Sequence, residues 1–318
     1  MGLLLHGAMT GRISIGMFLA FFQTTLTIVD TINSLLEAFG NFSREIQELS
    51  CLSAFFRLEN MPVQKGCLDK PVRRIRFEHV CFTYPCSEKE VLHDINFELD
   101  VSQSTAVVGE NGSGKTTIIK LLCGLYQPTS GRILFDDCDL KNLSSSEIGK
   151  VIKVVFQDFF QYEMTIRENI GFGNLNKISH DMELQNVLDA VHLEELKKLG
   201  LDTPLGKLEP AGIDLSRGQW QRLAVSRIFL NDTGFAVLDE PTASVDPVSE
   251  YNMYRLFYSL LKSRGSLMIS HRLASAKMAD HILVLKNGTI AEQGNHSELM
   301  KKQGFYYKLF CKQAEWYQ

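Results

Sequence analysis

A glycine-rich segment at residues 109–116 carries the residue types that bind a phosphate chain. Its sequence, Gly-Glu-Asn-Gly-Ser-Gly-Lys-Thr, fits the pattern G-x-x-x-x-G-K-[ST] at every fixed position. Glycines allow a tight turn that brings backbone N–H groups against phosphate oxygens. Lys115 adds a positive charge near the β- and γ-phosphates, and the Thr116 hydroxyl is a suitable ligand for Mg²⁺. The segment therefore predicts a nucleotide-binding loop.

The residues on either side of this loop support that interpretation. Residues 105–108 predict a short buried strand, and residues 117–122 predict a helix with an apolar stripe. A strand, a glycine-rich loop and a helix in this order point the helix N-terminus at an anion. This context disfavours the alternative, an ordinary glycine-rich loop. The residues expected to contact the nucleotide here are Gly109, Glu110, Asn111, Gly112, Ser113, Gly114, Lys115, Thr116 and Thr117.

Two carboxylates, Asp239 and Glu240, end an apolar run at residues 235–238. A buried strand would deliver them at the carboxyl edge of an α/β sheet, where such sheets bind ligands. Asp239 is suited to hold Mg²⁺ through water, and Glu240 is suited to polarise an attacking water as a general base. Taken alone, a strand that ends in solvated acids explains the pattern equally well. Beside a phosphate loop, the metal and base roles are favoured.

Residues 215–221, Leu-Ser-Arg-Gly-Gln-Trp-Gln, resemble the LSGGQ signature of the ATP-binding cassette (ABC) family. The resemblance continues in family order over residues 73–318, and it implies ATP and Mg²⁺ as ligands and ATP hydrolysis as the reaction. By this resemblance, Tyr84 matches the aromatic residue that stacks on adenine, Gln157 the Q-loop glutamine near the catalytic centre and Mg²⁺, residues 244–246 the D-loop, and His271 the catalytic switch histidine that contacts the γ-phosphate.

The family resemblance also implies a partner subunit. In this family the signature of one subunit contacts the γ-phosphate of ATP bound by the other, so a head-to-tail homo- or heterodimer is implied. Ser216 is expected to open a helix, so that its hydroxyl and the N–H groups of Gly218 and Gln219 face that anion.

Two departures from the family pattern leave open how the ATP-binding domain is coupled to the membrane domain. Arg217 replaces the first glycine of the signature pair, and Pro210 stands where many exporters carry a glutamate that touches the coupling helices.

The amino-terminal segment predicts a membrane helix. Residues 13–29 form an uncharged run of 17 residues between Arg12 and Asp30, at the lower end of what spans a hydrocarbon core. A buried soluble helix is an alternative; a signal peptide is disfavoured because its charged region and cleavage site are missing. Beyond Asp30, apolar residues recur at helical spacing, which predicts that the helix continues into water. These residues are Ile32, Leu35, Leu36, Phe39 and Phe42.

Charge and cysteine content narrow the class of protein further. The 318 residues carry a formal net charge of −4, so no broad basic surface for nucleic acid is expected. The seven cysteines include no C-x-x-C pair, which favours reduced thiols over a metal or disulfide site. They are Cys51, Cys67, Cys81, Cys86, Cys123, Cys138 and Cys311.

The predicted fold is an α/β P-loop ABC ATPase domain, with a mixed sheet core and a helical subdomain at about 157–230, preceded by a transmembrane helix. Residues 1–61 are expected to be a partial membrane domain, residues 62–72 a linker, and residues 73–318 the ATP-binding domain. This order resembles ABC exporters, which have six spans per half, so most of the translocation pathway is expected to be absent from this chain. The resemblance places the protein in the plasma membrane, with the ATPase domain on the cytoplasmic side.

The expected function is the ATP-hydrolysing motor of an exporter of peptides, lipids or drugs. The amino-acid sequence around Gln157 and in the signature resembles that of Gram-positive peptide or lantibiotic exporters. The aromatic residues Phe159, Phe160 and Tyr162 could dock on membrane-domain coupling helices, or could equally pack inside the helical subdomain. Two alternatives stay open: a soluble ABC ATPase without a transport role, and a truncated nucleotide-binding module that dimerises but moves nothing.

Overall fold

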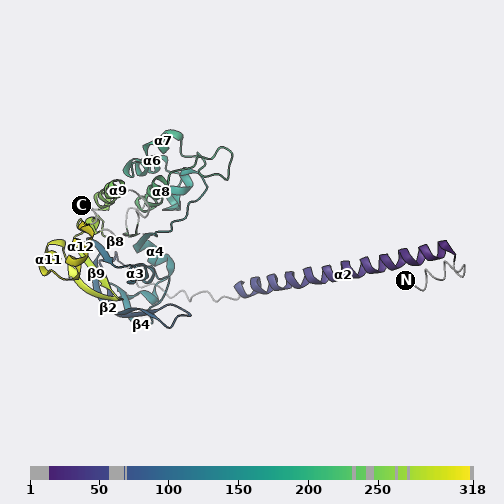
Figure 1. Cartoon of the computed structure of the whole chain (residues 1–318). Helices are drawn as coiled ribbons and strands as arrows, with labels where there is room; N and C mark the ends of the chain where they lie inside the picture. The colour runs from purple at the N-terminus through teal and green to yellow at the C-terminus, as the bar shows by residue number, and fades with distance from the viewer. Residues whose placement is uncertain are drawn as a thin grey trace. The chain divides into compact units, whose positions relative to one another are not determined.

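The computed structural model describes residues 14–56, 68, 70–230, 234–240, 247–261, 264–270 and 273–315. The chain divides into two compact units, Met1–Pro62 and Val63–Gln318. Figure 1 shows the long helix of the first unit and the mixed α/β fold of the second. Several sequence predictions concern residues outside the described ranges: the switch histidine His271, the D-loop residues 244–246, residues 1–13 and most of the linker.

The described part of the first unit is one helix, α2 (Ile15–Phe56). Within it, Leu19–Ser53 is long and apolar enough to cross a membrane, judged by length and composition. Threonine hydroxyls in this helix donate to backbone carbonyls four residues earlier, as Thr24 does to Ala20. Such internal bonds satisfy a hydroxyl without an external partner, so threonine is compatible with an apolar helix. As predicted, the helix continues without interruption from the apolar run into the amphipathic segment beyond Asp30.

The second unit is built on two sheets and a set of helices. Its strands are β1 (Arg74–Thr83), β2 (Glu90–Asp100), β3 (Ser104–Gly109), β4 (Ser130–Phe135), β5 (Cys138–Asp139), β6 (Ile152–Val155), β7 (Phe235–Asp239), β8 (Ser266–Ile269), β9 (His281–Lys286) and β10 (Thr289–Gly294). Its α-helices are α3 (Lys115–Leu122), α4 (Ser145–Val151), α5 (Ile166–Gly171), α6 (Asp181–Ala190), α7 (Glu194–Leu199), α8 (Arg217–Phe229), α9 (Pro247–Leu261), α10 (Leu273–Ala276), α11 (His296–Lys302) and α12 (Phe305–Glu315). Two 3₁₀ turns, η1 (Leu140–Asn142) and η2 (Leu175–Lys177), complete the described elements.

The larger sheet has the strand order β10-β9-β3-β8-β7-β6. Its neighbouring strands are parallel except for β9 and β10, which are antiparallel. The strands predicted at 105–108 and 235–238 lie within β3 and β7, and both are buried, because helices cover a parallel sheet on its two faces. The predicted, largely parallel sheet is therefore confirmed.

A second, antiparallel sheet has the order β2-β1-β4-β5 and was not anticipated as a separate layer. Buried residues alternate along β1 and β2, as expected for a sheet with one face on the core. Phe77 and Phe97 stack across these two strands with ring centroids 4.4 Å apart. Their cluster includes Ile118 and Leu122 of α3 and Val107 of β3, so one core joins both sheets to the phosphate-loop helix.

The helices between β6 and β7 form a layer with a core of its own, around buried residues such as Leu188, Trp220 and Leu223. Figure 1 shows α6, α7 and α8 together at one end of the second unit, away from β2 and β4 at the other. A second cluster, which includes Val225 of α8 and Leu238 of β7, attaches this layer to the larger sheet. The layer thus has a core of its own and is attached to the larger sheet through β7.

A buried amide, Asn169 of α5, fastens the loop before α5 to helix α8. Its Nδ2 atom donates to the carbonyls of Tyr162 at 2.9 Å and Thr165 at 3.1 Å. Arg227 of α8 donates to both its backbone carbonyl and its Oδ1 atom, each at 3.0 Å. Because the amide is fully buried, its removal would leave several polar groups without partners.

We therefore expect Asn169→Ala to lower the free energy of unfolding of the helical layer by about 2–3 kcal/mol. Urea unfolding can be followed by the fluorescence of buried Trp220 in a Trp316→Phe background. Asn176→Ala is the matched control, because Asn176 is exposed and its side chain makes no buried contact of this kind to any residue that the structure describes. Equal midpoints for the two alanine variants would contradict the role given to Asn169.

Candidate functional site

The loop that joins β3 to α3 forms one wall of a cleft of about 370 Å³. Residues from several separate parts of the chain meet there: the phosphate loop, the end of β7, the segment after β6, and the stretch from the end of β1 to the start of β2. The lining residues are Tyr84, Val91, Asn111, Gly112, Gly114, Lys115, Thr116, Thr117, Gln157 and Glu240. The structure thus brings together the sequence-predicted loop, the predicted adenine-side tyrosine, the Q-loop glutamine and the predicted base.

The loop backbone is shaped for an anion. Gly112 and Gly114 have φ angles of 75° and 104°, in the left-handed region that favours glycine. A side chain at Gly114 would also meet Leu92 at 2.6 Å. Gly114 is the N-cap of α3 and provides no side-chain cap, so the first N–H groups of the helix are left for another acceptor. Phosphate oxygens are acceptors of the required charge.

Two polar side chains of the loop are buried in a way that suits a bound nucleotide. The Ser113 hydroxyl is buried and, within the described part of the chain, has no hydrogen-bond partner. The Lys115 ammonium donates to the carbonyls of Gly109 and Glu110, each at 3.0 Å. Burial lowers the pKa of Lys115, and the negative charges of Glu240 and Asp239 oppose that shift. A buried cation held by neutral carbonyls is well placed to bind a more negative ligand.

The carboxyl end of β7 supplies the acids. Asp239 is 1% exposed, and its Oδ1 atom accepts a hydrogen bond from the Thr116 hydroxyl at 3.3 Å. Glu240, next along the chain, has a φ angle of 46°, which is unusual for a residue other than glycine. Glu240 directly follows β7 and lines the cleft together with Lys115. Strained backbone of this kind is common at functional sites.

The oxygens gathered here fit the chemistry of Mg²⁺. A threonine hydroxyl and one buried carboxylate lie within hydrogen-bond distance, and magnesium is commonly held by one or two carboxylates together with water and substrate phosphates. Gln157, the third predicted metal contact, lines the same cleft from the segment after β6. Among the described residues there is no group of three or more histidine, cysteine, aspartate or glutamate side chains that could hold a metal by themselves.

Tyr84 stands just after β1 at the side of the cleft. Its hydroxyl and that of Thr117 lie 3.0 Å apart, and its ring packs edge-on against Phe82 and Tyr126 at centroid distances of 4.9 and 5.3 Å. The Lys120 ammonium lies 5.5 Å from the ring centroid. Sequence reasoning missed Tyr126 and Lys120, because they reach Tyr84 only through the fold. The ring is therefore held in place by its neighbours, as a stacking surface requires.

The signature residues lie elsewhere in this chain. Ser216 caps α8, and its hydroxyl accepts from the Gln219 N–H at 3.3 Å, while the Gln219 side chain accepts from the Ser216 N–H at 2.7 Å. The predicted helix start at Ser216 is confirmed. Neither these residues nor Gly218 line the cleft that contains Lys115. One chain therefore presents a phosphate loop and a signature helix at separate places.

Comparison with known proteins identifies this arrangement. The ABC transporter family profile matches residues 92–243. The subtilin transport ATP-binding protein of Bacillus subtilis is 35% identical over 95% of this chain and 50% of its own length. An ATP-dependent lipid A-core flippase of Nitrosococcus oceani is also 35% identical, over 95% of this chain and 51% of its own length. This chain contains an ABC transporter ATP-binding domain.

A solved structure agrees with that assignment. A bacterial Atm1-family ABC exporter with ATP bound matches 84% of this chain and 47% of its own, with a TM-score of 0.71 and 28% sequence identity. The chain spans about half the length of the relatives it matches. The ABC domain binds nucleotide, and its predicted α/β fold with a preceding apolar helix is confirmed.

The segment before the signature in this ABC domain is fixed by a residue that the sequence did not single out. Glu163 accepts hydrogen bonds from the backbone N–H groups of Lys207 and Leu208, at 2.9 and 2.7 Å. Pro210 is exposed in the following turn. The contact joins residues more than 40 positions apart, so no local sequence signal could have revealed it.

The aromatic residues after the Q-loop divide between the two expectations. Phe159 is half-buried and packs against two core clusters of the ABC domain, as the packing alternative predicted. Phe160 is 69% exposed and lies 5.0 Å, centroid to centroid, from Tyr162. Tyr162 also contacts Phe172 at 4.8 Å and has the Arg227 guanidinium over its ring. The exposed Phe160 ring thus lies against Tyr162, which also contacts Phe172 and Arg227.

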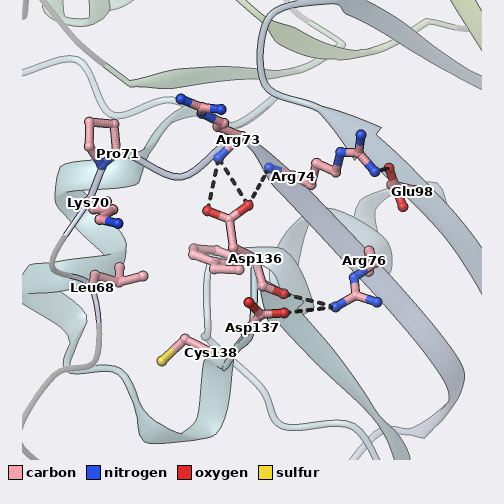
Figure 2. A pocket seen from close by; sticks show the side chains of 11 residues that line it. Leu68, Lys70, Pro71, Arg73, Arg74, Arg76, Glu98, Asp136, Asp137 and Cys138 are labelled. Atoms are coloured by element: carbon pink, nitrogen blue, oxygen red, sulfur yellow. Dashed lines mark hydrogen bonds and ion pairs between the residues drawn. The ribbon is translucent and has the colours of Figure 1, made fainter.

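A larger cleft, of about 940 Å³, lies at the start of β1 and is separate from the nucleotide cleft (Figure 2). The Asp136 carboxylate accepts from the backbone N–H groups of Arg73 and Arg74, at distances of 2.9 to 3.2 Å. Arg74 pairs with Glu98, and Arg76 lies 3.6 Å from Asp137. Its acidic groups are engaged within the ABC domain itself: Asp136 and Asp137 hold the start of β1 to the β4–β5 turn, and Glu98 pairs with β1 from β2.

The cysteines depart from the expectation at one position. Cys138 is disulfide-bonded, contrary to the prediction of reduced thiols throughout. Among the described residues, Cys51, Cys81, Cys86, Cys123 and Cys311 are free. Burial raises the pKa of the Cys123 thiol to about 12, so this cysteine at the C-terminal end of α3 stays protonated.

We expect Lys115→Met to leave the nucleotide-free protein at least as stable as the parent, because a buried charge is replaced by an apolar chain of similar length. ATP affinity should fall by about a hundredfold, since charge-assisted contacts to phosphate are lost. Thermal unfolding with and without ATP measures both effects. Lys150→Met, at an exposed lysine, is the control and should keep the full ATP-dependent shift. An undiminished shift in Lys115→Met would refute the role of Lys115.

Proposed function

We propose that this chain is the ATP-hydrolysing motor portion of an ABC exporter. The observation that carries the proposal is the convergence, in one cleft, of the Lys115 ammonium, the Thr116 hydroxyl and the Glu240 carboxylate, with the buried Asp239 carboxylate hydrogen-bonded to Thr116. The relatives named above are transport proteins, and they support a transport role. Because the chain spans about half of their length, transport itself is assigned to the complete assembly.

In the proposed reaction, Glu240 acts as the general base. Its carboxylate accepts a proton from a water whose oxygen forms a bond to the γ-phosphorus, and the bond between that phosphorus and the β,γ-bridging oxygen breaks. ADP and inorganic phosphate leave. Lys115 and the N–H groups at the start of α3 bind the phosphate oxygens and fix their position. The left-handed turn at Glu240 sets the direction of its side chain at the sheet edge.

The remaining site residues bind and orient. Tyr84, held against Tyr126, is the proposed stacking surface for adenine. Thr116, Asp239 and Gln157 would hold Mg²⁺, which when bound neutralises phosphate charge. His271, outside the described residues, is proposed to donate a hydrogen bond to the γ-phosphate.

A second ABC subunit completes the site. Ser216, Gly218 and Gln219 do not line the cleft of their own chain, so we assign them to ATP bound by a head-to-tail partner. The α8 N-terminus is already capped and ordered, and it can meet a phosphate without refolding. Arg217 is exposed at the first position of this helix and would bring an additional cation to the shared site.

The membrane is the second proposed partner. The apolar span Leu19–Ser53 is assigned to the membrane domain of an exporter in the plasma membrane, with the ATPase domain on the cytoplasmic side. The exposed edge at Phe160 is assigned to coupling-helix contact. The similarity to subtilin and lipid A-core transport proteins favours a peptide or lipid as the substrate.

We expect Glu240→Gln to lower kcat for ATP hydrolysis by about a thousandfold while ATP binding is retained. The amide keeps the size of the side chain and loses its ability to accept a proton. Phosphate release measures turnover, and the ATP-dependent thermal shift measures binding. Glu88→Gln, an exposed carboxylate outside the cleft, is the control. Hydrolysis at the parent rate in Glu240→Gln would sink the assignment of the base.

A subunit-mixing experiment tests the shared site. Lys115→Met and Ser216→Arg should each abolish hydrolysis when expressed alone. Co-expressed with different tags and purified through both, the two variants form mixed dimers with one wholly intact site, provided that the signature acts on the partner's ATP. Hydrolysis should then recover in the mixed dimer, to about half the parent rate if the two sites act independently. No recovery, in a mixed dimer that still binds ATP, would show that the site is not shared.

A further inference from the structure

The signature glutamine, Gln219, is held by a carboxylate from a neighbouring helix. Its Nε2 atom donates to the Glu195 carboxylate of α7 at 2.6 Å, while its Oε1 atom accepts from the backbone N–H of Ser216 at 2.7 Å. The two ends of the amide thus have partners of opposite kind, because an ionised carboxylate only accepts and an N–H group only donates. A flipped amide would lose both bonds. Glu195 therefore fixes a single orientation of the Gln219 side chain.

This orientation leaves the proton of the Ser216 hydroxyl for an external acceptor. The Ser216 N–H is bonded to the Gln219 side chain, and the Ser216 Oγ atom accepts from the Gln219 N–H at 3.3 Å. A serine hydroxyl has one proton to donate, and among the described residues that proton has no bonded acceptor. Ser216 is exposed at the N-terminal end of α8, where the helix dipole favours an anion. The two reciprocal bonds thus keep one hydroxyl donor at the end of this helix.

A second contact joins the start of α7 to α8. The Arg222 guanidinium donates to the backbone carbonyl of His192, two residues before α7 begins. Gln219 and Arg222 are three positions apart, so their side chains lie on the same face of α8. Leu196 of α7 and Trp220 of α8 belong to one buried core. The first turn of α7 is therefore packed against α8 at the place where it supplies the carboxylate.

We propose that Glu195 is a positioning residue for ATP hydrolysis, which acts through Gln219 on the Ser216 hydroxyl. The proposal rests on the function proposed above, in which the signature of one subunit contacts ATP bound by its partner. A hydrogen-bond donor stabilises a reacting phosphate only when it is held in the correct direction. Glu195 supplies that direction from outside the signature and makes no contact with the nucleotide itself.

The negative charge of Glu195 acts in the opposite direction. A carboxylate close to a phosphate-binding surface repels the phosphate, so its removal would strengthen the partner's contact if charge were its only effect. Loss of the acceptor, in contrast, releases the Gln219 amide and weakens that contact. The two effects have opposite signs, and substitutions at Glu195 can therefore separate them.

The test uses mixed dimers in which one subunit carries Lys115→Met and the other carries Ser216→Arg. The intact site then combines the signature of the first subunit with the phosphate loop of the second. Glu195→Met, which removes the acceptor and keeps the length of the side chain, is added to one subunit or to the other. Glu195→Gln keeps an acceptor oxygen. Glu194→Met is the control, because Glu194 is exposed in the same turn and its carboxylate contacts His192.

With Glu195→Met in the Lys115→Met subunit, we expect kcat for ATP hydrolysis to fall about fivefold, because this subunit supplies the working signature. The same change in the Ser216→Arg subunit should alter the rate by less than about twofold, since that signature is already inactive. A general loss of stability would lower the rate in both arrangements. Glu195→Gln should restore the rate, and Glu194→Met should leave it unchanged in either subunit.

Two results would overturn the role given to Glu195. One is an equal rate with Glu195→Met in either subunit. The other is a higher rate with both Glu195→Met and Glu195→Gln, which would show that the carboxylate acts only as a negative charge. A mixed dimer that recovers no hydrolysis before any change at Glu195 would instead contradict the shared site, and with it the function on which the proposal rests.

Discussion

The buried Lys115 ammonium, bonded to the carbonyls of Gly109 and Glu110, is the interaction on which the site depends. A charge in this position loses its water and gains only two neutral hydrogen-bond acceptors. These contacts do not neutralise the positive charge. The nearby carboxylates of Asp239 and Glu240 support the charge and also repel an incoming phosphate. In the proposed function, loop amides, the ammonium and Mg²⁺ therefore act together on the nucleotide. Removal of any one changes the balance for the others.

This balance requires segments that are far apart in the sequence to meet at one sheet edge. Strands β3 and β7 both pair in parallel with β8, with Val107 and Asp239 opposite the same residue, Ile269. Because parallel strands place their carboxyl ends together, the phosphate loop after β3 and the acid pair at β7 face one cleft. The hydrogen bond between Thr116 and Asp239 is the direct product of that register. A shift of one residue in β7 would turn Asp239 to the other face of the sheet.

Local patterns could be interpreted correctly from the sequence because they depend on interactions between residues that are close together in the chain. The Ser-x-x-Gln pattern at Ser216 predicts a capping box and hence a helix start, which is what the structure has. The glycine pattern and the apolar run before Asp239 likewise specify their own backbone. Contacts over long separations could not be found in this way. Glu163 reaches the backbone at 207–208, and Gln313 reaches Leu273, only because packing of whole helices brings them there.

The same distinction explains why Phe159 is packed in the core and Phe160 is exposed, since adjacent residues of one type carry no signal of which one faces the core.

The signature helix shows the same dependence on local interactions. Its N-terminus is formed by Ser216 and Gln219 within one chain, and the Gln219 amide further donates to Glu195 at 2.6 Å. In the proposed dimer, a partner's phosphate would meet a preformed surface, so closure would order few new backbone groups. The free energy of ATP binding is then available to bring two rigid faces together.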